Sequence, residues 1–426
     1  MPVSATPSIT SARRVRGRLE LPPDKSIAHR ALIFGALSGG PSTVSMRSPG
    51  RDVLSTLKCL RDLGVTIEHS ADRYRISGRP SRDAALNCGN SGTTMRLLAG
   101  ALAGLSLTVT LDGDASLRAR PMERVATLLR AAGADVTTTD GRAPVIIAGS
   151  NKLVPATHRL PVASAQLLGA TVLAAMSVTG ETTIESPGPT RDHTERMLAW
   201  MGVPIQRDGG VTTVTGPTRP RPFELKVPGD PSAASAWLVA AALHPDAELT
   251  MIEVGLNPTR LALVGLLQRM GVDIDTRVTD VSGPEPVGEV SVRGGRPLRA
   301  VDLHGGEVAE LIDELPLIAI AMASVEEASE VRDASELRVK ETDRIAAVVA
   351  GLEGIGARVE ELSDGWRVRR GSPRSARITT HGDHRVAIAF AIAGFTGIAS
   401  AVELDDSDCV AVSYPGFWDD LDMVRA

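Results

Sequence analysis

The chain of 426 residues is long enough for two or three domains, and its 43% hydrophobic and 23% charged residues are typical of a globular protein. A net charge of −5 and an aromatic content of 3% disfavour a nucleic-acid-binding protein, because basic surface and stacking platforms are both scarce. The three cysteines form no C-x-x-C pair, which argues against a disulfide framework or a cysteine-only metal site. The N-terminal residues lack the apolar core of a signal peptide, and no run of about 18 apolar residues occurs. We therefore expect a cytoplasmic protein.

In chain order, a phrase made of an amphipathic helix, a glycine and an alternating strand recurs five times. Its first copy reads C-L-R-D-L-G-V-T-I-E and its fourth reads L-L-Q-R-M-G-V-D-I-D. The glycine in each copy suits a left-handed C-cap, which would end the helix before the strand begins. These glycines are Gly64, Gly133, Gly202, Gly271 and Gly356, and the first four are evenly spaced.

A second phrase alternates with the first and consists of a strand, a small or polar turn and an Ala/Leu-rich helix. Its six copies span 19–37, 86–105, 160–176, 225–243, 301–322 and 378–392. Together the two phrases predict six repeated βαβαββ units in an α/β fold, three units in each of two domains.

A proline-rich stretch at 217–231 indicates where the chain crosses from one domain to the other. We expect one domain at 22–228, with units one to three. The other domain would combine the N-terminal strand within 1–21 with units four to six at 229–426. The whole chain, 1–426, would then form one two-domain module.

Residues 90–96, N-S-G-T-T-M-R, predict an anion site at the start of the second Ala/Leu-rich helix. Backbone N–H groups at a helix start have no intrahelical acceptor, and the helix dipole places partial positive charge there. Gly92 allows a ligand close to the backbone, Thr93 can donate, and Arg96 adds a cation. An ordinary capped helix is the alternative interpretation.

Other copies of the second phrase also place polar or charged residues near a helix start. If these helix starts converge between the two domains, they would line a cleft with positive potential for small anions. Alternatives remain for each group: Lys340, Glu341 and Arg344 could be a solvated helix face, His384 a structural histidine and Asp383 a helix cap. Asp313 lies in an apolar run, as either a helix-start cap or a functional carboxylate.

Two specific motifs occur: L-N-C-G-N-S-G-T-T-M-R at 86–96 and R-V-K-E-T-D-R-I at 338–345. With D-K-S-I-A-H-R at 24–30 and D-H-R at 383–385, the chain resembles the enolpyruvyl transferase family over essentially its whole length. The resemblance is to the branch of the shikimate pathway that joins shikimate 3-phosphate and phosphoenolpyruvate and releases phosphate. It implies an inside-out α/β barrel in each domain and an active site in the interdomain cleft.

The resemblance also implies roles for individual residues. The implied catalytic residues are Asp313, Glu341 and Lys25. The implied ligands of shikimate 3-phosphate are Lys25, Ser26, Arg30, Ser164, Gln166, Ser186, Arg191, Asp313 and Lys340. The implied ligands of phosphoenolpyruvate are Lys25, Asn90, Gly92, Thr93, Arg120, Gln166, Arg344, His384 and Arg385. Neither a metal ion nor an organic cofactor is expected. Besides its two substrates we expect no nucleic-acid or membrane partner, and we expect a monomer.

The chain departs from the family pattern in three places. Val412 stands where a lysine often contacts phosphoenolpyruvate, and Glu336 where an asparagine often contacts the shikimate phosphate. A tyrosine near the shikimate ring is absent from 187–191, where Arg191 is the expected substitute.

Two alternative functions remain. The sibling branch acts on UDP-N-acetylglucosamine, but it has a Lys-Asn pair at the place of Lys25-Ser26. It also usually has a cysteine within 115–120, where this chain has none. The other alternative is a non-catalytic anion-binding relative.

Overall fold

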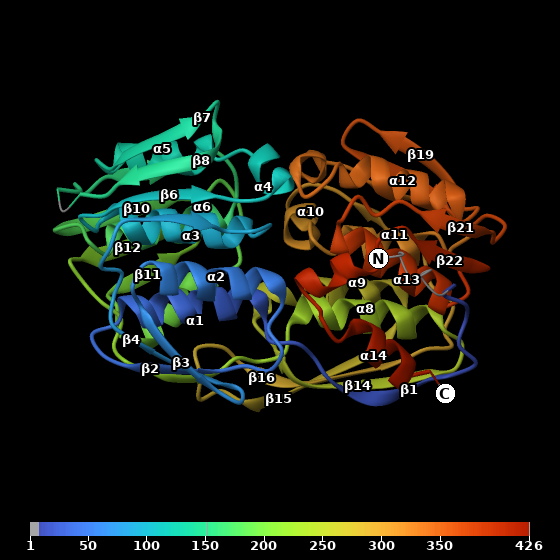
Figure 1. Cartoon of the computed structure of the whole chain (residues 1–426). Coiled ribbons are helices and arrows are strands. Elements are labelled where there is room, and N and C mark those ends of the chain that lie inside the picture. Colours follow the sequence, from blue (N-terminus) through green and yellow to red (C-terminus); the bar gives the residue numbers. More distant parts are fainter. Residues whose placement is uncertain (1–7, 151, 426) are drawn as a thin grey trace, which may run out of the picture. The chain divides into compact units, whose positions relative to one another are not determined.

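The computed structural model describes residues 8–150 and 152–425, which divide into two compact units (Figure 1). The first unit comprises Pro23–Pro228 and the short segment Val281–Glu285. The second unit comprises the described residues before Pro23, Gly229–Asp280 and the chain from Pro286 onward. The predicted domains instead place 281–285 with the second unit and Pro22 with the first, and their residues 1–7, 151 and 426 lie outside the described part.

The first unit contains three modules, each with one four-stranded sheet. Within each sheet the two strands nearest one edge pair in parallel, and the two further strands pair antiparallel. The strand orders are β13-β2-β4-β3, β5-β6-β8-β7 and β11-β12-β10-β9.

The elements of the first unit are α1 (Lys25–Leu37), β2 (Ser42–Ser45), α2 (Arg51–Asp62), β3 (Thr66–Ser70), β4 (Arg73–Ser77), β5 (Ala84–Asn87), α3 (Gly92–Ala103), β6 (Thr108–Asp112), α4 (Ala115–Ala119), α5 (Glu123–Ala131), β7 (Asp135–Thr139), β8 (Arg142–Ala148), β9 (Thr157–Arg159), α6 (Ala165–Ala175), β10 (Gly180–Glu185), α7 (His193–Trp200), β11 (Ile205–Asp208), β12 (Val211–Gly216) and β13 (Glu224–Lys226).

The second unit has two more modules of the same kind, with strand orders β1-β14-β16-β15 and β17-β18-β20-β19. Its elements are β1 (Val15–Glu20), α8 (Pro231–Leu243), β14 (Ala247–Gly255), η1 (Pro258–Arg260), α9 (Ala262–Met270), β15 (Asp273–Asp280), β16 (Val287–Arg293), β17 (Asp302–Leu303), α10 (Gly306–Leu311), α11 (Leu315–Met322), β18 (Ser329–Val331), η2 (Ser335–Val339), α12 (Arg344–Gly354), β19 (Arg358–Leu362), β20 (Gly365–Arg369), β21 (Ser375–Ile378), α13 (His384–Phe395), β22 (Ala401–Leu404), η3 (Asp408–Val412) and α14 (Phe417–Met423).

The recurring glycines end their helices as the sequence predicts. Gly64, Gly133, Gly202, Gly271 and Gly356 have φ angles of 92°, 95°, 82°, 105° and 90°. A side chain at these positive φ values would clash with the backbone. Glycine therefore lets the backbone turn from helix to strand with little steric strain.

The sixth module departs from the predicted βαβαββ repeat. Among the described residues, its sheet consists of the parallel pair β21 and β22 with an isolated bridge from Ile9 to Val402, and the short helices η3 and α14 follow. After β22 the sequence offers no second amphipathic helix with a glycine and a strand, and an aromatic cluster forms instead. The Trp237 indole donates to the Tyr414 hydroxyl at 2.9 Å, and the ring centroids of Trp237 and Phe417 lie 5.7 Å apart.

Each unit has its own hydrophobic core with buried helices at its centre. In the first unit these are α1, α3 and α6, and in the second α8, α11 and α13. These helices are apolar on nearly every side, which is typical of helices surrounded by other elements. Polar side chains on them are therefore concentrated at the ends, and most predicted site residues lie at or just before the N-terminal ends.

Candidate active-site residues

The start of α1 holds three of the predicted residues. Asp24 caps the helix by accepting a hydrogen bond from the Ile27 N–H at 2.9 Å. Lys25, the first helical residue, donates to Asp52 Oδ2 at 3.0 Å. The Ser26 carbonyl accepts a hydrogen bond from Arg30 Nη1 at 3.0 Å, which fixes the guanidinium against its own helix.

Arg30 is buried in the first unit. Its Nε donates to Thr194 Oγ1, in the first turn of α7, at 2.8 Å. Burial lowers the pKa of Arg30 to about 10, although the charges of Glu195 and Asp24 oppose the shift. Arg30 therefore stays a cation at neutral pH, in a place where an anion would find little competing water.

At the start of α3, where the sequence predicts an anion site, the helix is capped and two arginines lie close by. Ser91 caps the helix by accepting from the Thr94 N–H at 3.1 Å. A Cβ added at Gly92 would lie 2.7 Å from Arg96 Nη1 and 3.4 Å from Arg120 Nη1. Glycine thus lets two guanidinium groups approach one capped helix start.

Close packing of α3 on α6 brings Arg96 and Gln166 together. A Cβ at Gly100 would lie 2.1 Å from the Ala170 carbonyl oxygen, so glycine is required there for the two backbones to touch. One turn earlier on each helix, Arg96 Nη1 donates to Gln166 Oε1 at 2.6 Å. Gln166 Nε2 in turn donates to Thr93 Oγ1 at 3.0 Å, which closes a small polar network.

Arg120 is held beside this network. It is the C-cap residue of α4, it is 8% exposed, and it donates to Asn90 Oδ1 at 2.6 Å and to Ser116 Oγ at 3.2 Å. Asn90 Nδ2 donates to Asp114 Oδ2 at 2.9 Å, so the amide is oriented from both sides.

Three further predicted residues of the first unit have contacts elsewhere in that unit. Ser164 caps α6 by accepting from the Leu167 N–H at 3.4 Å. The Ser186 hydroxyl donates to the Gly188 carbonyl at 2.7 Å. Arg191 lies close enough to Arg30 for its charge to lower the pKa of that residue further.

In the second unit, the predicted cations and carboxylates gather around Arg344. A Cβ at Gly351 would lie 2.1 Å from Phe390 Cζ, so α12 and α13 pack closely at that level. Two turns earlier on both helices, Arg344 Nε donates to Asp383 Oδ2 at 2.7 Å. The Arg344 side chain is 2% exposed and that of Asp383 is 0% exposed.

Arg344 also contacts two predicted catalytic carboxylates. Its Nη2 donates to Glu341 Oε2 at 2.6 Å, and its Nη1 lies 3.6 Å from Asp313 Oδ1. Burial lowers the pKa of Arg344, but the charges of Asp383, Glu341 and Asp313 outweigh burial and raise that pKa above its ordinary value. Lys340 Nζ donates to Asp313 Oδ1 at 3.4 Å, which places Asp313 between two cations.

These contacts decide several of the alternatives. Lys340, Glu341 and Arg344 do not form a solvated helix face, because η2 ends at Val339 and α12 begins at the buried Arg344. Asp313 does not cap α11, whose N-cap residue is Glu314. Asp383 does cap α13, by accepting from the Arg385 N–H at 2.8 Å, and it binds Arg344 as well. His384 is buried at the first position of α13.

The family model for EPSP synthase (3-phosphoshikimate 1-carboxyvinyltransferase) matches residues 9–421. A 3-phosphoshikimate 1-carboxyvinyltransferase of Roseiflexus castenholzii is 46% identical, over 98% of this chain and 99% of that protein. One of Herpetosiphon aurantiacus is 43% identical over the same shares. The chain belongs to the EPSP synthase family.

Solved structures agree with this assignment to the EPSP synthase family. An EPSP synthase from Acinetobacter baumannii is similar with a TM-score of 0.86 and 35% identity, and the match covers 98% of each chain. The enolpyruvyl transferase NikO from Streptomyces tendae matches with a TM-score of 0.76 at 18% identity, over 99% of this chain and 98% of that one. That second likeness concerns the fold alone.

The structure of this EPSP synthase family member adds supporting residues that sequence reasoning missed. Arg385 Nη1 lies 3.6 Å from Glu314 Oε1, and the Ser232 hydroxyl donates to the same oxygen at 2.7 Å. The buried Arg260 donates to Ser232 Oγ at 2.6 Å and lies 3.3 Å from Asp230 Oδ1. Arg260 lies in the N-P-T-R turn of η1, and no local sequence pattern marks its contact with Asp230.

Two residues at which the chain departs from the family pattern lie on short 3-10 helices of the second unit. Glu336 is exposed on η2. Val412 ends η3 and contributes no cation there.

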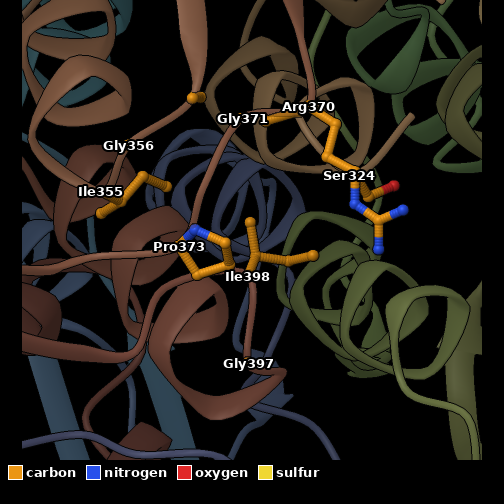
Figure 2. Close-up of a pocket in the computed structure, with 10 residues that line it drawn as sticks. Ser324, Ile355, Gly356, Arg370, Gly371, Pro373, Gly397 and Ile398 are labelled. Atoms are coloured by element: carbon orange, nitrogen blue, oxygen red, sulfur yellow. The ribbon is translucent and has the colours of Figure 1, made fainter. Parts of the chain in front are cut away.

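A pocket in the second unit lies away from these residues (Figure 2). Its wall includes Ser324 after α11, Ile355 after α12, Ile398 after α13 and Arg370 after β20. It is therefore formed at the C-terminal ends of the helices whose N-terminal ends carry Asp313, Arg344 and His384. None of the predicted site residues lines it.

The described residues contain neither a membrane-spanning helix nor a cluster of metal ligands. No helix in 8–150 or 152–425 is both long enough and apolar enough to cross a lipid bilayer. Within the same ranges, no group of three or more His, Cys, Asp and Glu side chains is placed to hold a metal ion.

Proposed function

We propose that the side chains described above carry out, in this chain, the reaction of the EPSP synthase family. The 1-carboxyvinyl group of phosphoenolpyruvate is transferred to the 5-hydroxyl of shikimate 3-phosphate, and phosphate is released. The two substrates are both anions and repel each other, so the reaction needs many cations to bring them together.

Shikimate 3-phosphate is proposed to bind through its phosphate and its carboxylate. The phosphate would be bound by Ser164, Ser186 and Lys340. The carboxylate would be bound by Ser26 and Arg30. Arg191, close to Arg30, takes the place of the missing tyrosine. The fork of Arg30 suits a carboxylate because it donates in parallel, and its burial strengthens the interaction.

Phosphoenolpyruvate is proposed to bind at the start of α3 and at the group around Arg344. The network of Arg96, Gln166 and Thr93 orients the donors beside Gly92, and Arg120 adds charge. This proposal rests on the approach of two guanidinium groups to a helix start. The proposed ligands are Lys25, Asn90, Gly92, Thr93, Arg120, Gln166, Arg344, His384 and Arg385.

The reaction needs one group that accepts a proton and another that donates a proton. The 5-hydroxyl loses its proton as its oxygen bonds to C2 of phosphoenolpyruvate, while C3 gains a proton and becomes a methyl group. In the second step, phosphate leaves C2 and C3 returns a proton. We propose Asp313 at the 5-hydroxyl and Glu341 near C3, with Lys25 assisting.

The observation that carries the proposal is the position of Asp313. Its Oδ1 lies 3.4 Å from Lys340 Nζ and 3.6 Å from Arg344 Nη1. A carboxylate between two cations can exchange a proton with a hydroxyl while the cations hold the anionic groups beside it. Charge that develops in the tetrahedral intermediate is stabilised by the same two cations.

Phosphate release tests the proposal. The purified chain is mixed with phosphoenolpyruvate and either shikimate 3-phosphate or UDP-N-acetylglucosamine, and free phosphate is followed with time. We expect release with shikimate 3-phosphate alone, and competition by glyphosate against phosphoenolpyruvate. Release only with the sugar nucleotide would favour the sibling reaction, and release with neither would favour a non-catalytic anion-binding protein.

We also propose that the chain works as a monomer in the cytoplasm. The free state of Cys59, Cys88 and Cys409 supports the reducing compartment. Sedimentation equilibrium at micromolar concentration would measure the mass, and a stable dimer would contradict the proposal.

A further inference from the structure

The loop between β15 and β16 is unusual in its packing. Both strands belong to the second unit, but the residues between them, Val281–Glu285, group with the first unit. The chain therefore leaves the second unit after Asp280 and returns to it at Pro286. Such an excursion needs interactions that hold the loop, and one of them involves a charged side chain.

Glu285, the last residue of this loop, is paired with His193. The two atoms Glu285 Oε1 and His193 Nδ1 lie 2.6 Å apart, and the side chains are 2% and 1% exposed. An ionised carboxylate can only accept, so the ring nitrogen donates. Burying a carboxylate is costly unless it is paired, so this contact fixes both partners firmly.

His193 is the first residue of α7, and its neighbours reach the group that we propose for the shikimate carboxylate. Thr194 follows it and accepts the hydrogen bond from Arg30 Nε at 2.8 Å. Arg191 precedes it by two residues. The start of α7 thus determines where the Thr194 hydroxyl and the Arg191 backbone lie.

The charge of Glu285 acts on the same group. Burial lowers the pKa of Arg30, and Glu285 is among the carboxylates whose charge opposes that shift. The carboxylate therefore favours the cationic form of Arg30 that an anionic substrate requires.

We infer that Glu285 is a positioning residue for shikimate 3-phosphate, because it anchors the start of α7 and thereby holds Thr194, Arg191 and Arg30 in place. The inference rests on the proposed function, in which Arg30 binds the substrate carboxylate. Glu285 does not itself contact the substrate in this scheme. It supplies orientation from a loop whose flanking strands belong to the other unit.

The test compares two glutamates of one hairpin. Glu285→Gln keeps the size and the accepting oxygen but removes the charge. The matched control, Glu289→Gln, lies on β16 and loses more exposed ion pairs with Arg277 at 2.6 Å and Arg18 at 2.8 Å. We expect Glu285→Gln to raise the KM for shikimate 3-phosphate about tenfold, with the KM for phosphoenolpyruvate and kcat changed less than about twofold. Glu289→Gln should leave all three unchanged.

A second readout does not depend on activity. Hydrogen exchange of the backbone amides at 191–196 should become faster in Glu285→Gln, while exchange in α3 and α6 stays as in the wild type. His193→Gln should have the same two effects, and the double variant should be no worse than either single one.

The two measurements distinguish a failure of the positioning role of Glu285 from a failure of the proposed function. Unchanged exchange at 191–196, or equal rises in both KM values, would overturn the positioning role. If the wild type releases no phosphate, the proposed function fails, and exchange still decides whether Glu285 anchors α7.

Discussion

The two units differ in the partners of their site arginines, although Lys25 of the first unit also donates to a carboxylate, Asp52. In the first unit, Arg30, Arg96 and Arg120 donate to neutral oxygens of Thr194, Gln166 and Asn90. In the second unit, Arg344 is surrounded by Asp383, Glu341 and Asp313, and Arg385 lies beside Glu314. Burial lowers the pKa of Arg30, whereas carboxylates raise that of Arg344.

This difference indicates a division of tasks. A guanidinium oriented by neutral oxygens keeps much of its charge for an incoming anion, so the first unit is suited to substrate binding. Carboxylates beside cations can accept and return protons while the cations hold anionic groups, so we propose that Asp313 and Glu341 act in the chemical steps while Arg344 beside them binds phosphoenolpyruvate.

The largest effect is expected from Asp313→Asn in the second unit. An amide cannot take the proton of the 5-hydroxyl, so kcat should fall about a thousandfold. Stopped-flow phosphate release measures it. Glu310→Gln, an exposed carboxylate nearby in the sequence, is the control and should retain normal turnover. A loss of less than tenfold in Asp313→Asn would remove Asp313 from the proton transfer.

Arg120→Ala in the first unit should lower kcat/KM by about a hundredfold, as expected for a group that stabilises transition-state charge. Arg118→Ala is the matched control, since Arg118 is exposed on α4 and pairs with Asp112. Near-normal kinetics of Arg120→Ala would exclude Arg120 from the site.

Arg260→Gln should act through its neighbours. Without Arg260, Ser232 and Glu314 lose their orientation, and Glu314 holds Arg385. We expect the KM for phosphoenolpyruvate to rise about tenfold, with a smaller change for shikimate 3-phosphate. Arg269→Gln on α9, which removes an exposed pair with Glu307, should change neither constant. Equal changes for both substrates would point to general loosening of the second unit.

The smallest effect concerns stability and His29. Burial, then the charges of Lys25 and Arg30, lowers the pKa of His29 well below 6.5. Below pH 6.5 His29 is protonated in the unfolded chain but stays neutral in the folded chain. The free energy of unfolding therefore decreases as the pH is lowered. His29 should cost about 1.4 kcal/mol per pH unit there, until its folded pKa is reached.

Urea unfolding between pH 7.5 and 5 measures this cost. His29→Gln should flatten the acid side of the profile, and His69→Gln, on the exposed strand β3, should not. Parallel profiles for wild type and His29→Gln would contradict the assignment.

Local structure was predictable from the sequence where it depends on the backbone conformation of a single residue. The five glycines end helices because their φ angles are positive, whatever surrounds them. The sixth module is shorter than the predicted repeat because the chain after β22 lacks the helix–glycine–strand phrase, which occurs in the first five modules.

Much of the candidate site was predictable as residue types but not as contacts. Arg344 and Asp383 meet because Gly351 lets α12 approach Phe390, which is a tertiary fact. The pairs of Glu285 with His193 and of Glu314 with Arg385 join distant segments, and no local pattern marks them. Whether the predicted site residues bind substrate as the resemblance implies stays a prediction.

Calorimetric titration of shikimate 3-phosphate into Arg30→Gln and Glu341→Gln tests the division of tasks most directly. Loss of a buried charged donor should weaken binding to Arg30→Gln about thirtyfold, while Glu341→Gln should bind within about threefold of the wild type despite its loss of turnover. Wild-type affinity in Arg30→Gln, with weakened binding in Glu341→Gln, would contradict the account.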